Sequence, residues 1–148
     1  MDNLTPFAER LFELMQDKGL SNLQLEKESG CPNTTVSAWL TKNVYPKREN
    51  LIKLSRYFYC SIDYLLGLTD DKKIDISNSP VSFKERFVSL VKEKRVTYYR
   101  VHKDCIIPSN YISRWLSKNL VPDVSTIIKL AAYFNCSTDY LLGSSDRK

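Results

Sequence analysis

The chain has 148 residues, of which 43% are hydrophobic and 26% are charged, and its net charge is +5. This composition is typical of a globular protein. No apolar stretch approaches the roughly 18 residues that suggest a membrane span, and the N-terminus lacks a basic region followed by an apolar run, so neither a membrane segment nor a signal peptide is expected.

Two helices are predicted at the start of the chain. Pro6 fits the first position of a helix, and Gly19 fits its C-terminal stop. Ser21 and Gln24 form a capping box that opens a short second helix, which Gly30 ends. A short helix, a turn containing glycine and a further helix are the outline of a helix-turn-helix.

A third helix is predicted to begin near Asn33 and to end at Thr41. Val36, Trp39 and Leu40 fall on one face at 100° per residue, and this face should be buried. The opposite face is small and uncharged, and consists of Thr34, Ser37, Ala38 and Thr41. A helix that faces only solvent usually carries charged side chains, so this face indicates close approach to another surface.

Two more helices and a linker complete the first half of the chain. The apolar spacing predicts a helix over residues 49–58 and a short one over residues 62–66. Residues 1–69 then form the first domain, and the polar segment 70–80 is a linker. With its flanks this linker has about 10 to 16 residues and would reach roughly 35 to 55 Å when extended.

The second half of the chain repeats the first. A shift of 76 positions places residues 20–46 on residues 96–122 without a gap, and the same register places YFYCSIDYLLG (57–67) on YFNCSTDYLLG (133–143). Such a repeat indicates two copies of one small domain, with the second over residues 81–148. Because the apolar spacing is helical and glycine is scarce, we predict an all-α protein built from two tandem five-helix bundles.

The second copy differs from the first in its turn and its outer face. Ile106 stands where the first copy has glycine, so the turn has to avoid a left-handed residue or carry one at an energetic cost. Ser82 and Glu85 read as a capping box, and Asp123 is a predicted N-cap. The third helix, residues 109–117, buries Ile112, Trp115 and Leu116 and exposes Asn110, Ser113, Arg114 and Ser117.

The excess positive charge lies in the second copy. Residues 1–74 hold ten Lys and Arg against ten Asp and Glu, whereas residues 75–148 hold twelve against seven. A basic surface indicates an anionic partner such as nucleic acid. Drift between the two copies is the alternative explanation.

No metal, cofactor or catalytic site is predicted. The cysteines at positions 31, 60, 105 and 136 form no CxxC pair, and His102 has no partner at ligand spacing. We expect Cys60 and Cys136 to be core thiols and His102 to be a surface residue. Since the sequence also lacks a Ser/His/Asp arrangement and a phosphate-binding glycine loop, we expect a protein that is not an enzyme.

The run L-S-N-x-x-L-x-x-x-S-G-x-x-x-x-T-V-S-x-W, followed by a helix that ends in D-Y-L-L-G, resembles the phage repressor and Cro type of helix-turn-helix, often called Xre-like. The resemblance covers both copies. It implies lambda-repressor-like bundles and a DNA-binding transcriptional regulator of bacterial or phage type, which would act in the cytoplasm at the nucleoid. A tandem pair is less usual in this family than a single domain that dimerises.

The resemblance also implies which residues contact DNA. The family reads bases from the start and outer face of the third helix, here Asn33, Thr34, Ser37, Ala38, Ser109, Asn110, Ser113 and Arg114, with Ser117 on the same face. It holds phosphate at the start of the second helix and after the third, here Ser21, Asn22, Thr97, Tyr98, Lys42, Asn43, Lys118 and Asn119. Lys47 and Arg48 are further phosphate candidates. Asn22 and Tyr98 stand where the family often has glutamine.

The two copies are predicted to contribute unequally to DNA binding. Asn110 and Arg114 suit bidentate pairing with adenine and guanine, so the second copy should supply most of the affinity and specificity. The expected partner is double-stranded DNA, with repression by promoter occlusion, and no small-molecule ligand is predicted. Homodimerisation stays open. The rival interpretation is an interaction protein in which one or both copies serve dimerisation or partner docking, and the neutral first copy favours it.

Overall fold

The computed structural model describes residues 4–148, and the regular structure in this range is entirely helical. Residues 1–3, with which the first predicted domain begins, lie outside that range. The chain divides into two compact units, Met1–Ile74 and Asp75–Lys148. We call them unit 1 and unit 2 and describe each by itself. No helix within residues 4–148 is both long enough and apolar enough to cross a membrane.

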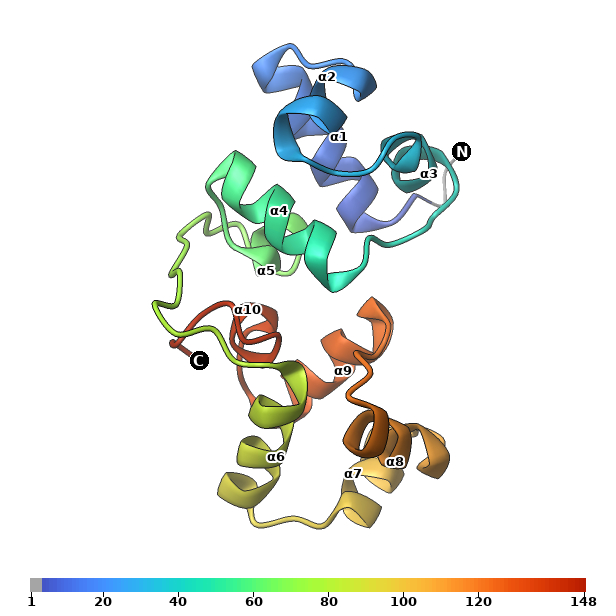
Figure 1. The fold of residues 1–148 in the computed structure, drawn as a ribbon, viewed down its shortest axis with the longest axis vertical. Helices are drawn as coiled ribbons and strands as arrows, with labels where there is room; N and C mark the ends of the chain where they lie inside the picture. The colour runs from blue at the N-terminus through green and yellow to red at the C-terminus, as the bar shows by residue number, and fades with distance from the viewer. Residues whose placement is uncertain (1–3) are drawn as a thin grey trace. The chain divides into compact units, whose positions relative to one another are not determined.

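Unit 1 contains five helices within its described residues, drawn from blue to green in Figure 1. They are α1 (Pro6–Lys18), α2 (Asn22–Ser29), α3 (Thr35–Thr41), α4 (Arg48–Phe58) and α5 (Ile62–Leu65). Several predicted helix ends are confirmed. Pro6 starts α1, Gly19 ends it in a left-handed conformation, and the capping box of Ser21 and Gln24 is present at α2.

The core of unit 1 forms where α1 packs against α3 and α5, and α2 packs against α3 and α4. Phe7 and Leu11 of α1 are fully buried, and so is Leu25 of α2. The Phe7 ring meets Trp39 edge to face with 6.2 Å between ring centroids, which is a favourable aromatic geometry. The inward face predicted for the third helix is therefore confirmed at Val36 and Trp39, whose side chains are 0% and 3% exposed.

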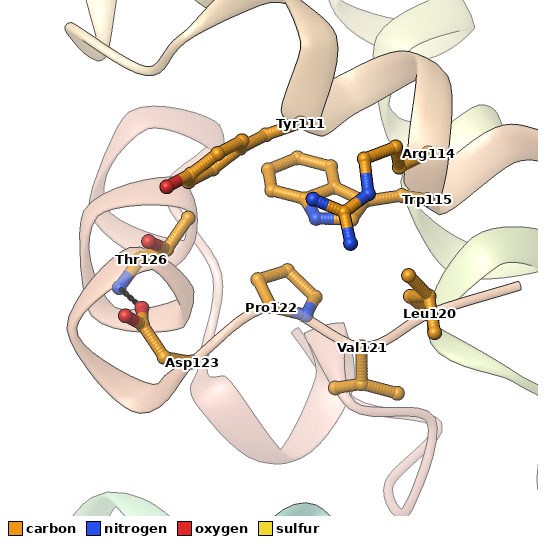
Figure 2. Close-up of a pocket in the computed structure, with 8 residues that line it drawn as sticks. All are labelled: Tyr111, Arg114, Trp115, Leu120, Val121, Pro122, Asp123 and Thr126. Atoms are coloured by element: carbon orange, nitrogen blue, oxygen red, sulfur yellow. Dashed lines mark hydrogen bonds between the residues drawn. The ribbon is translucent and has the colours of Figure 1, made fainter. Parts of the chain in front are cut away.

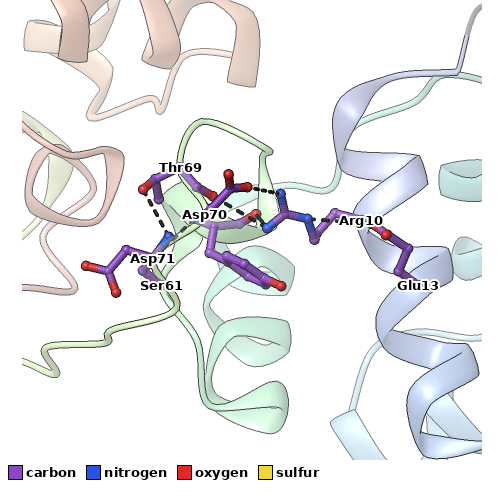
Figure 3. Close-up of polar contacts among 7 residues, drawn as sticks. Arg10, Glu13, Ser61, Thr69, Asp70 and Asp71 are labelled. Atoms are coloured by element: carbon purple, nitrogen blue, oxygen red, sulfur yellow. Dashed lines mark hydrogen bonds and ion pairs between the residues drawn. The ribbon is translucent and has the colours of Figure 1, made fainter.

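Arg10 joins α1 to the segment that follows α5 (Figure 3). Its guanidinium carbon lies 3.8 Å from the centroid of the Tyr64 ring, and its Nη1 donates to the Tyr64 carbonyl oxygen at 3.1 Å. Its Nη2 lies 3.4 Å from Asp70 Oδ1. These contacts hold the residues after α5 against α1, so the segment from residue 70 onward does not begin as a free linker.

Unit 2 also contains five helices, drawn from yellow-green to red in Figure 1. They are α6 (Phe83–Lys94), α7 (Tyr98–Asp104), α8 (Ser109–Lys118), α9 (Val124–Phe134) and α10 (Thr138–Leu141). The starts of α7, α9 and α10 each lie 76 residues after the starts of α2, α4 and α5. The predicted N-cap at Asp123 is confirmed, since its Oδ1 accepts from the Thr126 backbone N–H at 2.9 Å.

Aromatic rings fill much of the core of unit 2. Phe83 and Phe87 stack with 5.5 Å between centroids, and both meet Trp115 edge to face at 5.7 and 5.6 Å. An arginine again ties the first helix to the chain end. The Arg86 guanidinium carbon lies 3.6 Å from the Tyr140 ring centroid, and its Nη2 donates to the Ser145 carbonyl oxygen at 3.4 Å.

Two sequence predictions about helix starts are wrong in detail. α3 begins at Thr35 rather than near Asn33, because Asn33 and Thr34 form the preceding turn and Thr34 is left-handed with φ 69°. Ser82 does cap α6, accepting from the Glu85 backbone N–H at 3.1 Å. However, the Glu85 carboxylate pairs with the Ser82 hydroxyl at 3.5 Å instead of reaching back to a backbone N–H, so this capping box is only half formed.

The predicted linker is hydrogen-bonded to each of the two units. The Lys72 carbonyl oxygen accepts from the Ser61 N–H of unit 1 at 3.1 Å. The Asp75 carboxylate accepts from the Ser145 hydroxyl and the Asp146 N–H of unit 2 at 2.9 and 3.1 Å. Only residues 73 and 74 lie between these anchors. The expectation of a tether that reaches 35 Å or more is therefore wrong, because three residue steps span at most about 11 Å.

Candidate nucleic-acid interface

The outer face of α8 carries an exposed row of polar side chains. Asn110, Ser113, Arg114 and Ser117 are all exposed, and their spacing of three and four residues puts them on one side of the helix. The Ser113 hydroxyl donates to the Asn110 carbonyl oxygen at 3.0 Å. Within residues 4–148 the Arg114 guanidinium has no hydrogen-bond or ion-pair partner. It is therefore available to an external acceptor.

The outer face of α3 is different, because it carries no charge and is partly covered. Ser37 and Thr41 are exposed, and the Thr41 hydroxyl donates to the Ser37 carbonyl oxygen at 2.7 Å. Ala38, at the position equivalent to Arg114, is half-buried. Asn33 and Thr34 are exposed but lie in the turn before α3 and not on the helix face as predicted. The outer face of α3 is therefore shorter and less polar than the outer face of α8.

The residue one turn before the turn between the second and third helices has a structural role in each unit that the sequence did not indicate. In unit 1 this residue is Glu26, which is 7% exposed and accepts from the Val36 N–H through Oε2 at 3.4 Å. In unit 2 it is His102, whose Nδ1 contacts the Ile107 carbonyl oxygen. The prediction that His102 is a surface residue is wrong, since the ring is half-buried against the turn. Glu26 and His102 occupy equivalent positions under the shift of 76 residues, and this equivalence was the only sequence signal that links them.

The turn of unit 2 contains a strained residue. Ile106 has φ 55°, and its side chain is 84% exposed. The sequence left open whether this turn avoids a left-handed residue or carries one at an energetic cost, and the structure shows a left-handed residue. A β-branched residue in this region is a genuine outlier, because its Cβ crowds the backbone. The next residue, Ile107, is buried, so the strained conformation turns one isoleucine inward and the other outward.

The predicted phosphate contacts lie at two places in each unit. Ser21 and Thr97 are N-caps that accept backbone N–H groups at 3.2 and 3.1 Å. Asn22 is exposed, and Tyr98 is 37% exposed with its ring stacked on Phe87 at 5.8 Å. The helix starts that carry them have outward N–H groups, which favour anions.

The residues after α3 and α8 form the other candidate phosphate contacts. Lys42, Lys47 and Lys118 are exposed, whereas Arg48 is half-buried at the start of α4. Asn43 and Asn119 are both left-handed, with φ 55° and 53°. Asn43 Oδ1 accepts from the Thr5 N–H at 3.2 Å. The oxygen of its side-chain amide is thus used within unit 1, and its NH₂ group is the part that remains for a phosphate.

The cysteines do not contribute reactive groups to this surface. Within residues 4–148 none of the four forms a disulfide bond, and burial raises the pKa of the Cys105 thiol at the end of α7, with the Asp104 carboxylate adding to the shift. The thiol therefore stays protonated and weakly nucleophilic. Cys60 is buried as predicted, while Cys136 is only half-buried. Within residues 4–148 no group of three His, Cys, Asp or Glu side chains is placed to hold a metal ion.

A pocket beside the outer face of α8 was not predicted from the sequence. It has a volume of about 180 Å³ and lies between α8, the α8–α9 loop and the start of α9. Figure 2 shows its lining residues. They are Tyr111, Arg114, Trp115, Leu120, Val121, Pro122, Asp123 and Thr126. The loop positions gave no periodic signal, so only the folded chain brings them against the helix.

Comparison with known proteins assigns part of unit 1. Residues 11–65, from within α1 to the end of α5, match the family model described as helix-turn-helix. This segment is a helix-turn-helix domain. The chain is also 31% identical over 65 residues to a protein of Bacillus subtilis (strain 168) that is named uncharacterized HTH-type transcriptional regulator YobD. That match covers 44% of this chain and 58% of the relative. No solved structure matched the chain.

Proposed function

We propose that the protein is a transcriptional regulator that binds double-stranded DNA, with unit 2 as a second copy of the helix-turn-helix domain. The observation that carries this proposal is the helix-turn-helix match of residues 11–65 together with the exposed polar face of α8. The regulator named in the match covers only part of the chain, so the proposal for unit 2 depends on its own helices. Their order is that of unit 1, and α7 packs against α8 as α2 packs against α3.

In the proposed complex, α8 enters the major groove. Arg114 is unpaired and exposed, and its planar fork suits O6 and N7 of guanine, while Asn110 suits N6 and N7 of adenine. Lys118 and the start of α7 would contact phosphate. α3 would occupy a second half-site with fewer base contacts, because it offers Ser37 but no charged side chain. Binding of both units across a promoter would exclude polymerase, so the proposed role is that of a repressor.

A second candidate function is protein docking through unit 1. Its charges cancel, and it exposes large apolar side chains at Phe12 (52%), Leu23 (56%) and Tyr59 (72%). Exposed aromatic and aliphatic groups are common in protein interfaces. In this alternative unit 1 binds a partner or a second copy, and only unit 2 contacts DNA.

The proposal is tested by selecting duplexes from a random library with the full chain and then measuring affinities by fluorescence anisotropy. Arg114→Gln should lose discrimination at one base position by about 1–3 kcal/mol. Lys118→Gln should weaken all duplexes alike and lower the salt slope by about one. Lys129→Gln removes one charge from an exposed position on α9 and serves as the matched control.

Three results would change the assignment. If the chain binds no duplex even at low salt, the regulator proposal fails and the docking function replaces it. If Arg114→Gln keeps the site preference while Ser37→Ala abolishes it, unit 1 is the principal reader. If the selected motif has one part only and Arg114→Gln abolishes its selection, unit 1 does not read bases.

A further inference from the structure

The pocket beside α8 combines free hydrogen-bond donors with apolar walls. The Arg114 guanidinium is unpaired within residues 4–148, as described above. Trp115 is 4% exposed, and its indole N–H has no partner among the same residues. Every fully buried side-chain nitrogen or oxygen in that range has a partner. The indole N–H is therefore open to solvent, and Trp115 and Arg114 both line the pocket together with Pro122, as Figure 2 shows.

The remaining walls favour a ligand with a small apolar body. Leu120 and Val121 are each 41% exposed, and Tyr111 is 44% exposed, so apolar surface that faces water would be covered on binding. The volume of about 180 Å³ is close to that of cavities of about 150 Å³ that hold one benzene ring in another protein. The Asp123 carboxylate lies on the opposite side of the pocket and is held by the Thr126 N–H.

We propose that this pocket binds a small organic carboxylate that carries a single apolar ring. One carboxylate oxygen would accept from the Arg114 guanidinium and the other from the Trp115 indole N–H. The ring would lie against Pro122 and Tyr111. The Asp123 carboxylate sets the orientation, because it repels the anionic end toward Arg114. Binding would be a charge-assisted contact in a partly apolar site, where such contacts are strongest.

Occupation of the pocket has a regulatory consequence that rests on the proposed function. Arg114 cannot hold a carboxylate and the edge of a guanine at the same time. Ligand and DNA would therefore compete for one guanidinium, and the ligand would act as an inducer that releases the protein from DNA. Binding of the carboxylate itself does not depend on DNA binding, so the two claims are tested separately.

The occupant is tested by NMR titration of the full chain with benzoate. The chain has two tryptophans, one in each unit, so two indole N–H signals report the two units independently. The Trp115 signal should shift in a saturable way with a dissociation constant on the order of 1 mM, as expected for a ligand of about nine non-hydrogen atoms. The Trp39 signal should not move. If neither signal shifts, or if both shift alike, the proposal is wrong.

Matched variants and probes identify the chemistry. Arg114→Gln should weaken benzoate binding at least about tenfold, while an unchanged urea midpoint of its Trp115 signal shows that unit 2 stays folded. Lys129→Gln should bind as the wild type does. Benzyl alcohol, which keeps the ring without the charge, should bind at least about tenfold more weakly. Equal binding by Arg114→Gln or by benzyl alcohol would overturn the assignment.

Inorganic phosphate and DNA complete the test. If phosphate shifts the Trp115 signal as well as benzoate does, the site takes a bare anion such as a DNA phosphate, and the organic carboxylate is excluded. Benzoate at ten times its dissociation constant should weaken binding to a selected duplex about elevenfold. An unchanged DNA affinity would overturn the inducer role. A chain that binds benzoate but no DNA would contradict only the proposed function.

Discussion

Ile106 holds a left-handed backbone conformation at a position where its side chain gains little from burial. With φ 55° and 84% of its side chain exposed, the residue carries steric strain that no packing offsets. Unit 1 has Gly30 at the equivalent position, with φ 83°. The same turn geometry is therefore formed by a residue without a Cβ in one unit and by a β-branched residue in the other.

We expect Ile106→Gly to stabilise unit 2. Removing the side chain relieves about 1–2 kcal/mol of left-handed strain. The greater freedom of glycine in the unfolded chain opposes this gain by about 0.5–1 kcal/mol. The net gain should be about 1 kcal/mol, measured as a rise in the urea midpoint of the Trp115 indole signal. Ile106→Ala keeps the strain and should be less stable than the glycine variant. Equal stability of the two variants would show that the turn is not strained.

The converse substitution in unit 1 provides the control. A Cβ added at Gly30 meets no atom within 4 Å, so Gly30→Ala tests the backbone conformation without a packing clash. It should lower the urea midpoint of the Trp39 signal by the equivalent of about 1 kcal/mol and leave Trp115 unchanged. Gly143 differs, since a Cβ there would lie 1.9 Å from the Val81 carbonyl oxygen, and steric exclusion would dominate.

At the level of elements, a tyrosine links the fourth helix of each unit to the second. Tyr57 of α4 donates to Glu28 Oε1 at 2.5 Å, and Tyr133 of α9 donates to Asp104 Oδ2 at 2.8 Å. Burial, together with the hydrogen bond to Asp104 and the charge of that carboxylate, raises the pKa of Tyr133 from 10.0 to about 12. The pKa of Tyr57 is also raised, chiefly by its hydrogen bond to Glu28.

The raised pKa of Tyr133 predicts a stability loss at alkaline pH. In the unfolded chain this phenol ionises near 10, whereas in the folded unit it keeps its proton until about 12. Folding therefore retains a proton that unfolding releases. The contribution is complete below pH 10 and declines as the pH rises toward 12. Tyr133→Phe should destabilise unit 2 by about 0.5–1 kcal/mol near neutral pH.

The measurement compares the urea midpoint of Tyr133→Phe with that of the wild type by circular dichroism, near pH 8 and near pH 11. The difference between them should shrink at the higher pH, because only the wild type loses this contribution. Other groups that ionise between these two pH values are common to both proteins, so their effect cancels in the difference between the two urea midpoints. A difference that stays constant with pH would show that Asp104 does not hold the phenolic proton.

The elements that the sequence predicted well are those with local causes. Ser21 and Asp123 set helix starts as N-caps and Pro6 does so as the first helical residue, and the 100° spacing placed Trp39 and Trp115 inward. Features that depend on contacts between segments escaped prediction. The left-handed Thr34 shortened α3, Glu26 turned inward to the Val36 N–H of α3, and His102 turned inward against the turn. The pocket beside α8 required the fold of the α8–α9 loop, which no periodic pattern describes.

On the scale of the whole molecule, the two units differ in charge and are joined by a very short free segment. The net charge of +5 lies entirely in residues 75–148, so long-range attraction to DNA would act mainly on unit 2. If unit 2 binds DNA as proposed, unit 1 would be held nearby at a local concentration in the millimolar range. A neutral and weakly polar α3 would then suffice for a second half-site that it would not find alone.

The anchored linker should restrict which half-site spacings the protein accepts. Residues 73 and 74 are the only ones between the Ser61–Lys72 hydrogen bond and the Asp75 contacts with Ser145 and Asp146. If both units read DNA, the wild type should select a narrow range of spacings from a library with random spacer length. Insertion of Gly-Ser-Gly-Ser between Lys73 and Ile74 adds about 14 Å of reach and should broaden that range.

The indole signals of Trp39 and Trp115 should show unchanged stability of both units. A wild type that already tolerates all spacings would mean that the anchors release on DNA, whereas an unchanged narrow range after insertion would place the spacing rule in contacts other than the linker.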